Sequence, residues 1–180
     1  MQLARWVRAG KLIQLRRGLY VLPERLRYRE PPLERVANLL VSPSYVSLER
    51  ALSIHGLIPE TVPLVQSVTV GRAGMRETPL GRFDYRHVKG EWFFGYREMP
   101  LGDDSALVAT PEKALLDLFY LSKGEFTRQR IDGLRLQDLD RLDLEQIRAM
   151  AAKARSPRVE RAAEQLCAWV MEERKAWREV

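Results

Sequence analysis

The hydrophobic periodicity of this 180-residue chain changes twice along its length, and this change constrains the fold more than any other feature. Between residues 65 and 109, apolar side chains alternate with polar ones or form short blocks between glycine-containing turns, which is typical of β-strands. Before and after this stretch, apolar residues recur at the three- and four-residue spacing of amphipathic helices. This order predicts an α+β fold in which helices pack around a small, mainly antiparallel sheet and the C-terminal third is helical.

The patterns and capping residues place the individual elements. We expect strands at residues 65–70, 81–88, 92–97 and 106–109. We expect helices at residues 33–40, at 45–55 with Ser44 as N-cap, from Pro111 with Thr110 as N-cap, at 142–154, and from Pro157 onward. The last helix carries Trp169, Met171 and Trp177 in addition to its apolar stripe, which makes it a candidate docking face.

The first thirty residues contain the entire charge excess of the chain. Eight Arg and Lys residues stand against two Glu residues there, a net charge of +6, and the remaining 150 residues are neutral. A basic surface at one end of an otherwise balanced chain is typical of a phosphate-binding protein, because each cation placed at a phosphate releases condensed counterions. Nucleic acid is therefore the first partner to expect.

The same thirty residues have the pattern of a short helix followed by a hairpin. Residues 2–9 carry apolar side chains at helical spacing, and residues 11–22 form two short strand patterns around an Arg-Arg-Gly turn. A helix followed by a basic-tipped hairpin is the second half of a winged helix. We expect residues 1–30 to be a partial winged helix, residues 31–180 to be a separate α+β domain, and DNA to be contacted by Arg5, Arg8, Lys11, Arg16 and Arg17.

Several classes of function are disfavoured by what the sequence lacks. The apolar stretches are too short to cross a membrane and no secretory signal is recognisable, so we expect a soluble, cytoplasmic protein. Cys167 falls on the apolar stripe of the last helix, and His55 and His87 are far apart in sequence, so no metal site is expected. Phosphate-binding glycine loops, nucleophile elbows and zinc-protease motifs are missing, and we expect a non-enzymatic protein without a cofactor.

Five short blocks occur in order between residues 5 and 121. They are Arg5-Trp6 with Gly10 to Ile13, Leu15 to Val21, Pro43 to Glu49, His55 to Pro59, and Pro111 to Leu118. As an ordered set, these blocks resemble the AbiEi antitoxin family of the type IV abortive-infection toxin–antitoxin systems, which protect bacteria from phage. The helical C-terminal third is similar to that family only in general character.

The resemblance implies a transcriptional regulator with two parts. A winged-helix domain would repress the protein's own operon by binding inverted repeats in promoter DNA. The second domain would counter a nucleotidyltransferase toxin encoded alongside, without forming a stable complex with it. The Gly-Ser and Asp-x-Asp motif that such a toxin carries is missing here, so the chain is similar to the antitoxin partner.

The chain departs from a complete winged helix in one respect. Such a domain has two further helices before its recognition helix, and here only a few residues precede Gly10. A truncated chain, a start assigned too late and the loss of half the module would each account for this. We expect the helix at residues 2–9 to be poorly supported and DNA affinity to be chiefly electrostatic and strongly salt-dependent.

Two other functions remain open from the sequence. In the first, the β-rich domain and the apolar last helix form a protein-interaction module, and the basic end serves only solubility. In the second, a metal-dependent nuclease uses Asp84, Asp103 or Asp104 and requires magnesium.

Overall fold

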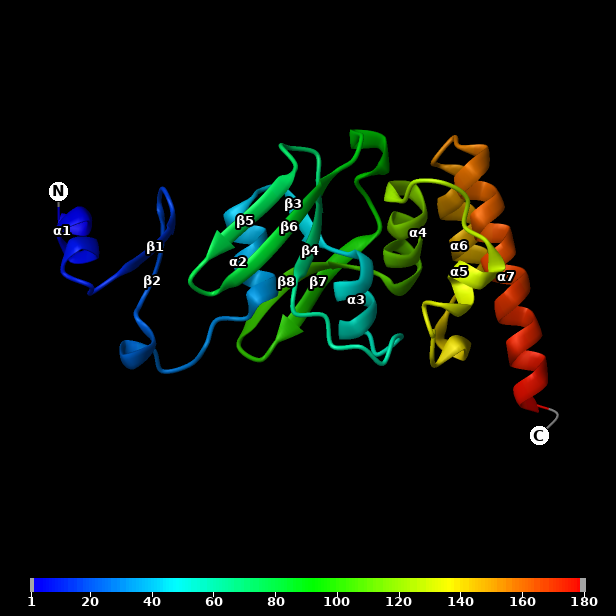
Figure 1. Cartoon of the computed structure of the whole chain (residues 1–180), viewed down its shortest axis with the longest axis horizontal. Coiled ribbons are helices and arrows are strands. Elements are labelled where there is room, and N and C mark those ends of the chain that lie inside the picture. The colour runs from blue at the N-terminus through cyan, green and yellow to red at the C-terminus, as the bar shows by residue number, and fades with distance from the viewer. Residues whose placement is uncertain (1, 179–180) are drawn as a thin grey trace.

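A six-stranded mixed sheet forms the centre of the molecule, and the computed structural model, which describes residues 2–178, confirms the α+β class (Figure 1). The strands are β3 (Ser44–Val46), β4 (Val65–Thr69), β5 (Gly74–Thr78), β6 (Gly81–His87), β7 (Tyr96–Leu101) and β8 (Asp104–Ala109). Their spatial order is β5-β6-β4-β3-β8-β7. Three pairs are antiparallel, but β4 with β6 and β3 with β8 are parallel, so the sheet is more mixed than the sequence predicts.

Helices cover both faces of this sheet. On one face lies α2 (Leu33–Leu40), where the hydroxyl of Tyr85 donates a hydrogen bond of 2.7 Å to the carbonyl oxygen of Ala37. On the other face lie α3 (Leu48–Ile54) and α4 (Pro111–Leu121), which also contact each other. Thr110 caps α4 as predicted, because its hydroxyl accepts the backbone N–H of Lys113 and Pro111 occupies the first helical position.

A helical layer beyond α4 completes the domain (Figure 1). It contains α5 (Arg128–Asp132), α6 (Leu144–Ala152) and α7 (Pro157–Arg178). The apolar stripe predicted for the last helix is buried, as is Cys167. No helix within residues 2–178 is both long and apolar enough to span a bilayer.

The N-terminal element lies at the end of the molecule opposite the C-terminus (Figure 1). It consists of α1 (Gln2–Arg8) and an antiparallel hairpin of β1 (Ile13–Arg16) and β2 (Leu19–Val21), so the predicted short helix and hairpin are confirmed. Gly18 supplies the positive φ of 81° that the turn requires. No residue of α1 is buried, which agrees with the expectation of a poorly supported helix. A 3-10 turn at Glu24–Leu26 begins the connection to α2.

Three local predictions were wrong. Ser44 does not cap a helix at 45–55, because Ser44–Val46 forms a central strand and the helix begins only at Leu48. The predicted strand at 92–97 begins at Tyr96, because residues Gly90–Trp92 form a 3-10 turn that places the Trp92 side chain in the core. The edge strand β5 was not predicted at all. In the first two cases burial against distant segments overrides the local pattern, whereas β5 is a half-exposed edge strand that pairs only with its neighbour β6.

Candidate nucleic-acid interface

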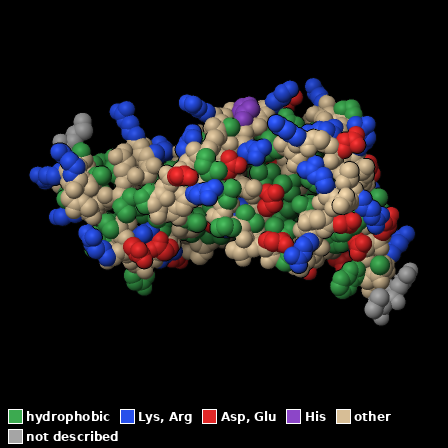
Figure 2. Space-filling view, in the orientation of Figure 1, with side chains coloured by type: hydrophobic (Ala, Val, Ile, Leu, Met, Phe, Trp, Pro, Cys, Tyr) green, Lys and Arg blue, Asp and Glu red, His purple; other side chains and the backbone are tan. Residues whose placement is uncertain are grey.

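The structure brings the five predicted DNA-contacting residues to one end of the molecule. Arg5 and Arg8 lie on α1, Lys11 follows it, Arg16 ends β1 and Arg17 occupies the hairpin turn. All five residues are exposed. Figure 2 shows Lys and Arg side chains projecting from this end in several directions. Within residues 2–178, Arg5, Arg8, Lys11 and Arg17 form no ion pair with a carboxylate, so their charge is available to an external anion.

Arg16 differs from the other four because it anchors the hairpin. Its Nε donates to the carbonyl oxygen of Leu39 at 3.0 Å, near the C-terminal end of α2, and its Nη1 donates to the carbonyl oxygen of Arg17 at 3.1 Å. A cation is favourable at this place, since the last carbonyl groups of a helix carry partial negative charge. We therefore assign Arg16 to positioning the hairpin and leave phosphate contact to its neighbour Arg17.

The N-terminal element is attached to the domain at a second point. The guanidinium group of Arg29 pairs with Asp103 at 2.8 Å and with Asp104 at 3.1 Å, in the turn between β7 and β8. Leu15 and Leu19 of the hairpin pack against the core. The basic element is thus held to the sheet by a few contacts at its base, and its helix and turn stay open to solvent.

The ion pairs of Arg29 also involve two of the three carboxylates that the sequence offers for a metal-dependent nuclease, Asp84, Asp103 and Asp104. Asp103 and Asp104 face Arg29, whereas Asp84 lies on β6 beside Arg86, and two other strands separate β6 from β8. The structure does not bring these three carboxylates together. In the part of the chain that is described, no three His, Cys, Asp or Glu side chains are grouped so as to hold a metal ion.

Further basic side chains project along the upper edge of the view in Figure 2, around a histidine. The Nδ1 atom of His87 lies 3.0 Å from the carbonyl oxygen of Gly71, which brings the turn after β4 beside the end of β6. Arg72, Arg86 and Lys89 are all exposed in these two segments.

The most elaborate polar cluster is buried, and sequence reasoning missed it. The carboxylate of Asp117 on α4 accepts hydrogen bonds from the side chains of Tyr45 (3.0 Å), Ser47 (2.7 Å) and Trp92 (2.8 Å). It also pairs with the ammonium group of Lys113, which lies over the Trp92 ring at 4.2 Å from the centroid. Lys113 and Asp117 have no exposed surface.

This cluster is closed to ligands, because its ion pair has no exposed surface. Burial lowers the pKa of Lys113, and the carboxylate of Asp117 opposes that shift. Burial raises the pKa of Tyr45, and the negative charge of Asp117 raises it further. The only signal in the sequence is a Lys and an Asp four residues apart in an otherwise apolar helix. That signal is easily overlooked, because a Lys and an Asp four residues apart are also typical of an exposed helix face.

Comparison with known proteins leaves the function to be argued from this geometry. No protein-family model matches the chain, and no curated protein sequence matches it. Two features of the geometry bear on function. The basic side chains at the N-terminal end are exposed to solvent, whereas the polar cluster around Asp117 is buried and cannot be reached by a ligand.

Proposed function

We propose that this protein binds promoter DNA through its N-terminal element and acts as the antitoxin and autorepressor of a type IV toxin–antitoxin pair. The DNA-binding part rests on four exposed cations at one end of the molecule that form no ion pair within the described residues: Arg5, Arg8, Lys11 and Arg17. The antitoxin part is supported by the ordered sequence blocks between residues 5 and 121 that resemble the AbiEi family.

The arrangement suits a duplex. Arg5 and Arg8 are three residues apart and share one side of α1, so the helix can present both to the major groove or its flanking phosphates. Arg17 at the hairpin turn can then reach the adjacent backbone or minor groove. Because α1 buries no residue against the domain, we expect affinity to come mainly from charge.

The test is a binding titration of the whole chain against its own upstream promoter duplex and a scrambled duplex, repeated over a series of salt concentrations. Replacing both Arg16 and Arg17 with Ala should weaken binding to both duplexes, since phosphate contacts carry no sequence information. The slope of log K against log salt should become shallower by about one unit for each phosphate that the variant no longer neutralises.

Single variants separate contact from positioning. Arg17→Gln should lower the salt slope by about one unit and leave the hairpin intact. Arg16→Gln removes the bond to Leu39 and should loosen the hairpin, which a loss of amide protection in β1 and β2 would report. Arg161→Gln is the matched control, since Arg161 lies on α7 at the far end and is equally exposed. An unchanged slope in Arg17→Gln would contradict the assignment.

The antitoxin part needs a separate measurement. Co-expression with the nucleotidyltransferase encoded beside this chain should restore growth, and a chain carrying Arg5→Gln, Arg8→Gln and Arg17→Gln should restore it equally well while losing promoter binding. Growth arrest that persists with the unchanged protein would reject the antitoxin proposal without affecting the DNA-binding one.

A further inference from the structure

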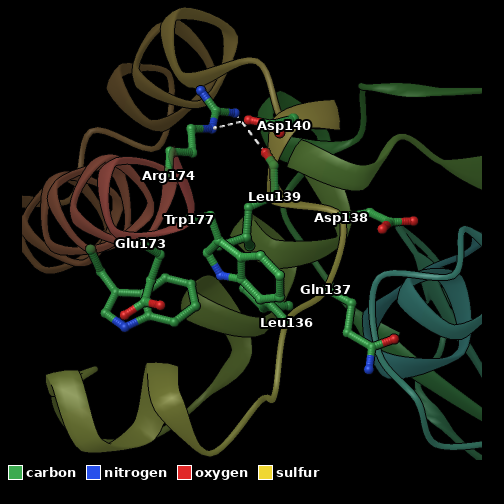
Figure 3. A pocket seen from close by; sticks show the side chains of 9 residues that line it. Leu136, Gln137, Asp138, Leu139, Asp140, Glu173, Arg174 and Trp177 are labelled. Atoms are coloured by element: carbon green, nitrogen blue, oxygen red, sulfur yellow. Dashed lines mark hydrogen bonds and ion pairs between the residues drawn. The ribbon is translucent and has the colours of Figure 1, made fainter. Parts of the chain in front are cut away.

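A hollow on the described surface lies between the end of α7 and the segment 136–140, far from the basic element. It encloses about 530 Å³, a volume within the range of peptide and small-molecule sites. Figure 3 shows Glu173, Arg174 and Trp177 approaching it from α7, with Leu136, Gln137 and Leu139 on the opposite side.

One side of the hollow is a continuation of the buried face of α7. Trp169, Glu173 and Trp177 follow at four-residue spacing and therefore share one side of the helix. Trp169 still packs against the core and is 8% exposed, whereas Trp177, two turns later, is 80% exposed. This face of α7 is therefore covered by the core at Trp169 but not two turns later, where the Trp177 ring is exposed.

The opposite side is fixed in place by backbone contacts. The N–H of Gln137 donates to the carbonyl oxygen of Leu57 at 2.8 Å. Arg174 donates from Nη2 to the carbonyl oxygens of Leu139 (2.6 Å) and Leu142 (2.7 Å), which ties this segment to α7. The hollow is therefore built into the structure before any partner arrives.

One of the three carboxylates around the hollow has no direct ion pair within the described side chains. Asp140 pairs with Arg174 at 3.5 Å, and Asp138 lies 3.7 Å from Arg141. Glu173 forms no ion pair with a side chain of residues 2–177, and its charge adds to that of Glu172 in raising the pKa of the Arg128 guanidinium on α5. The indole N–H of Trp169 is buried and has no acceptor within the same residues. The site therefore presents the Glu173 carboxylate and the exposed Trp177 ring, and Trp169 forms part of its wall.

We propose that this hollow binds an arginine side chain in a peptide segment of a partner protein. A guanidinium group can stack on the Trp177 ring and form two parallel hydrogen bonds with the Glu173 carboxylate. The inference is independent of the DNA-binding proposal, because it uses the other end of the molecule.

The test is a calorimetric titration of the full chain with acetyl-tetraarginine amide at about 50 mM salt, where screening is weak. We expect one peptide per chain. Glu173→Gln should weaken binding by about tenfold, because the charge-assisted bonds are removed. Trp177→Ala should weaken it by at least about fivefold. Both positions lie at the rim, so thermal unfolding midpoints should stay within about 2 °C of the unchanged protein.

Glu160→Gln is the matched control. Glu160 is an exposed glutamate on the same helix, about 20 Å away at the helical rise of 1.5 Å per residue, and its replacement should not change peptide affinity. Acetyl-tetralysine amide should bind several-fold more weakly than the arginine peptide, since an ammonium group cannot stack or pair in the same way.

Several results would overturn the proposal. No binding, equal binding of both peptides, or unchanged affinity in the Glu173→Gln and Trp177→Ala variants would show that the hollow does not recognise arginine. Self-association of the chain in sedimentation runs, abolished by Glu173→Gln, would instead identify the occupant as the basic N-terminal arm of a second copy.

Discussion

At the scale of single residues, Asp117 carries the largest expected effect on stability. Replacing it with Asn keeps the shape but leaves the fully buried ammonium group of Lys113 without a counter-charge. Breaking a buried ion pair by removing one partner costs about 3–5 kcal/mol. We therefore expect the free energy of unfolding of Asp117→Asn, measured by urea denaturation, to fall by about that amount.

The control for this variant is Asp132→Asn. Asp132 is exposed at the end of α5, and its side chain makes no hydrogen bond or ion pair within residues 2–178. A surface change of this kind should stay within about 0.5 kcal/mol. If Asp117→Asn were as stable as this control, the buried pair would contribute no net stability.

His55 should make stability depend on pH. It is 7% exposed, its Nε2 atom lies 2.8 Å from the carbonyl oxygen of Ala109, and burial lowers its pKa below the usual 6.5. Arg97 and Arg141 lower that pKa further, while Glu112 and the bond to Ala109 oppose the shift. In the unfolded chain His55 takes up a proton near its usual pKa of 6.5, whereas in the folded chain it does so only at lower pH. The free energy of unfolding therefore falls as the pH drops below about 6.5.

The measurement is the free energy of unfolding between pH 7.5 and 5 for the unchanged protein and for His55→Gln. The unchanged protein should lose stability over this interval, and the variant should lose less of it because Gln cannot take up a proton. Parallel curves for His55→Gln and the unchanged protein would contradict the assignment.

At the scale of elements, the end of α4 depends on a residue from another helix. Arg158 of α7 donates from Nη1 to the carbonyl oxygens of Phe119 (2.8 Å) and Ser122 (2.9 Å), and from Nη2 to that of Tyr120 (3.0 Å). These include carbonyl groups that a helix end leaves without intrahelical partners. One planar guanidinium group therefore closes α4 and joins it to α7.

Arg158→Lys should destabilise the protein by about 1–3 kcal/mol, because an ammonium group cannot reach three carbonyl oxygens in the geometry of the planar fork. Denaturant unfolding would measure this change. Arg161 lies one turn further along α7 and forms only an exposed ion pair with Glu125 at 3.9 Å. The control variant Arg161→Lys should therefore change stability by less than about 0.5 kcal/mol. Equal effects of the two changes would argue against the clamp.

The sequence predicted those elements well whose hydrophobic pattern, cap or turn lies within the element itself. The apolar stripe of α7, the Thr110 cap of α4 and the hairpin of β1 and β2 all follow from neighbouring residues, and all three are confirmed. Elements whose partners are distant were missed. Ser44–Val46 is a strand only because β4 and β8 flank it, and nothing local distinguishes it from a helix start.

In the candidate site, too, local properties could be predicted from the sequence and long-range contacts could not. The exposed position of Arg5, Arg8, Lys11 and Arg17 was predictable, since charge and turn chemistry are local properties. The anchoring role of Arg16 was not, because its acceptor Leu39 is 23 residues away. The buried cluster around Asp117 joins segments up to 72 residues apart, which no spacing rule could reveal.

At the scale of the whole molecule, the structure predicts a gradient of stability from the N-terminal element to the centre. Helix α1 buries no residue, whereas eight successive residues of α4, from Glu112 to Phe119, are buried. In hydrogen–deuterium exchange of the intact chain, amides of α1 should exchange by local opening, and those of α4 only on global unfolding. Equal protection of the two helices would show that α1 has a covering partner.

The position of β3 in the sheet also governs how the chain can fold as it leaves the ribosome. Val46 faces Val108 in the parallel pair of β3 and β8, so one side of this central strand has no partner until about sixty further residues have been synthesised. Until then, a growing chain that has paired β3 with β4 exposes a strand edge at the middle of the future sheet. Synthesis of β8 closes that edge, and α4 then supplies Asp117 for Tyr45, so this inner strand is paired on both sides only late in translation.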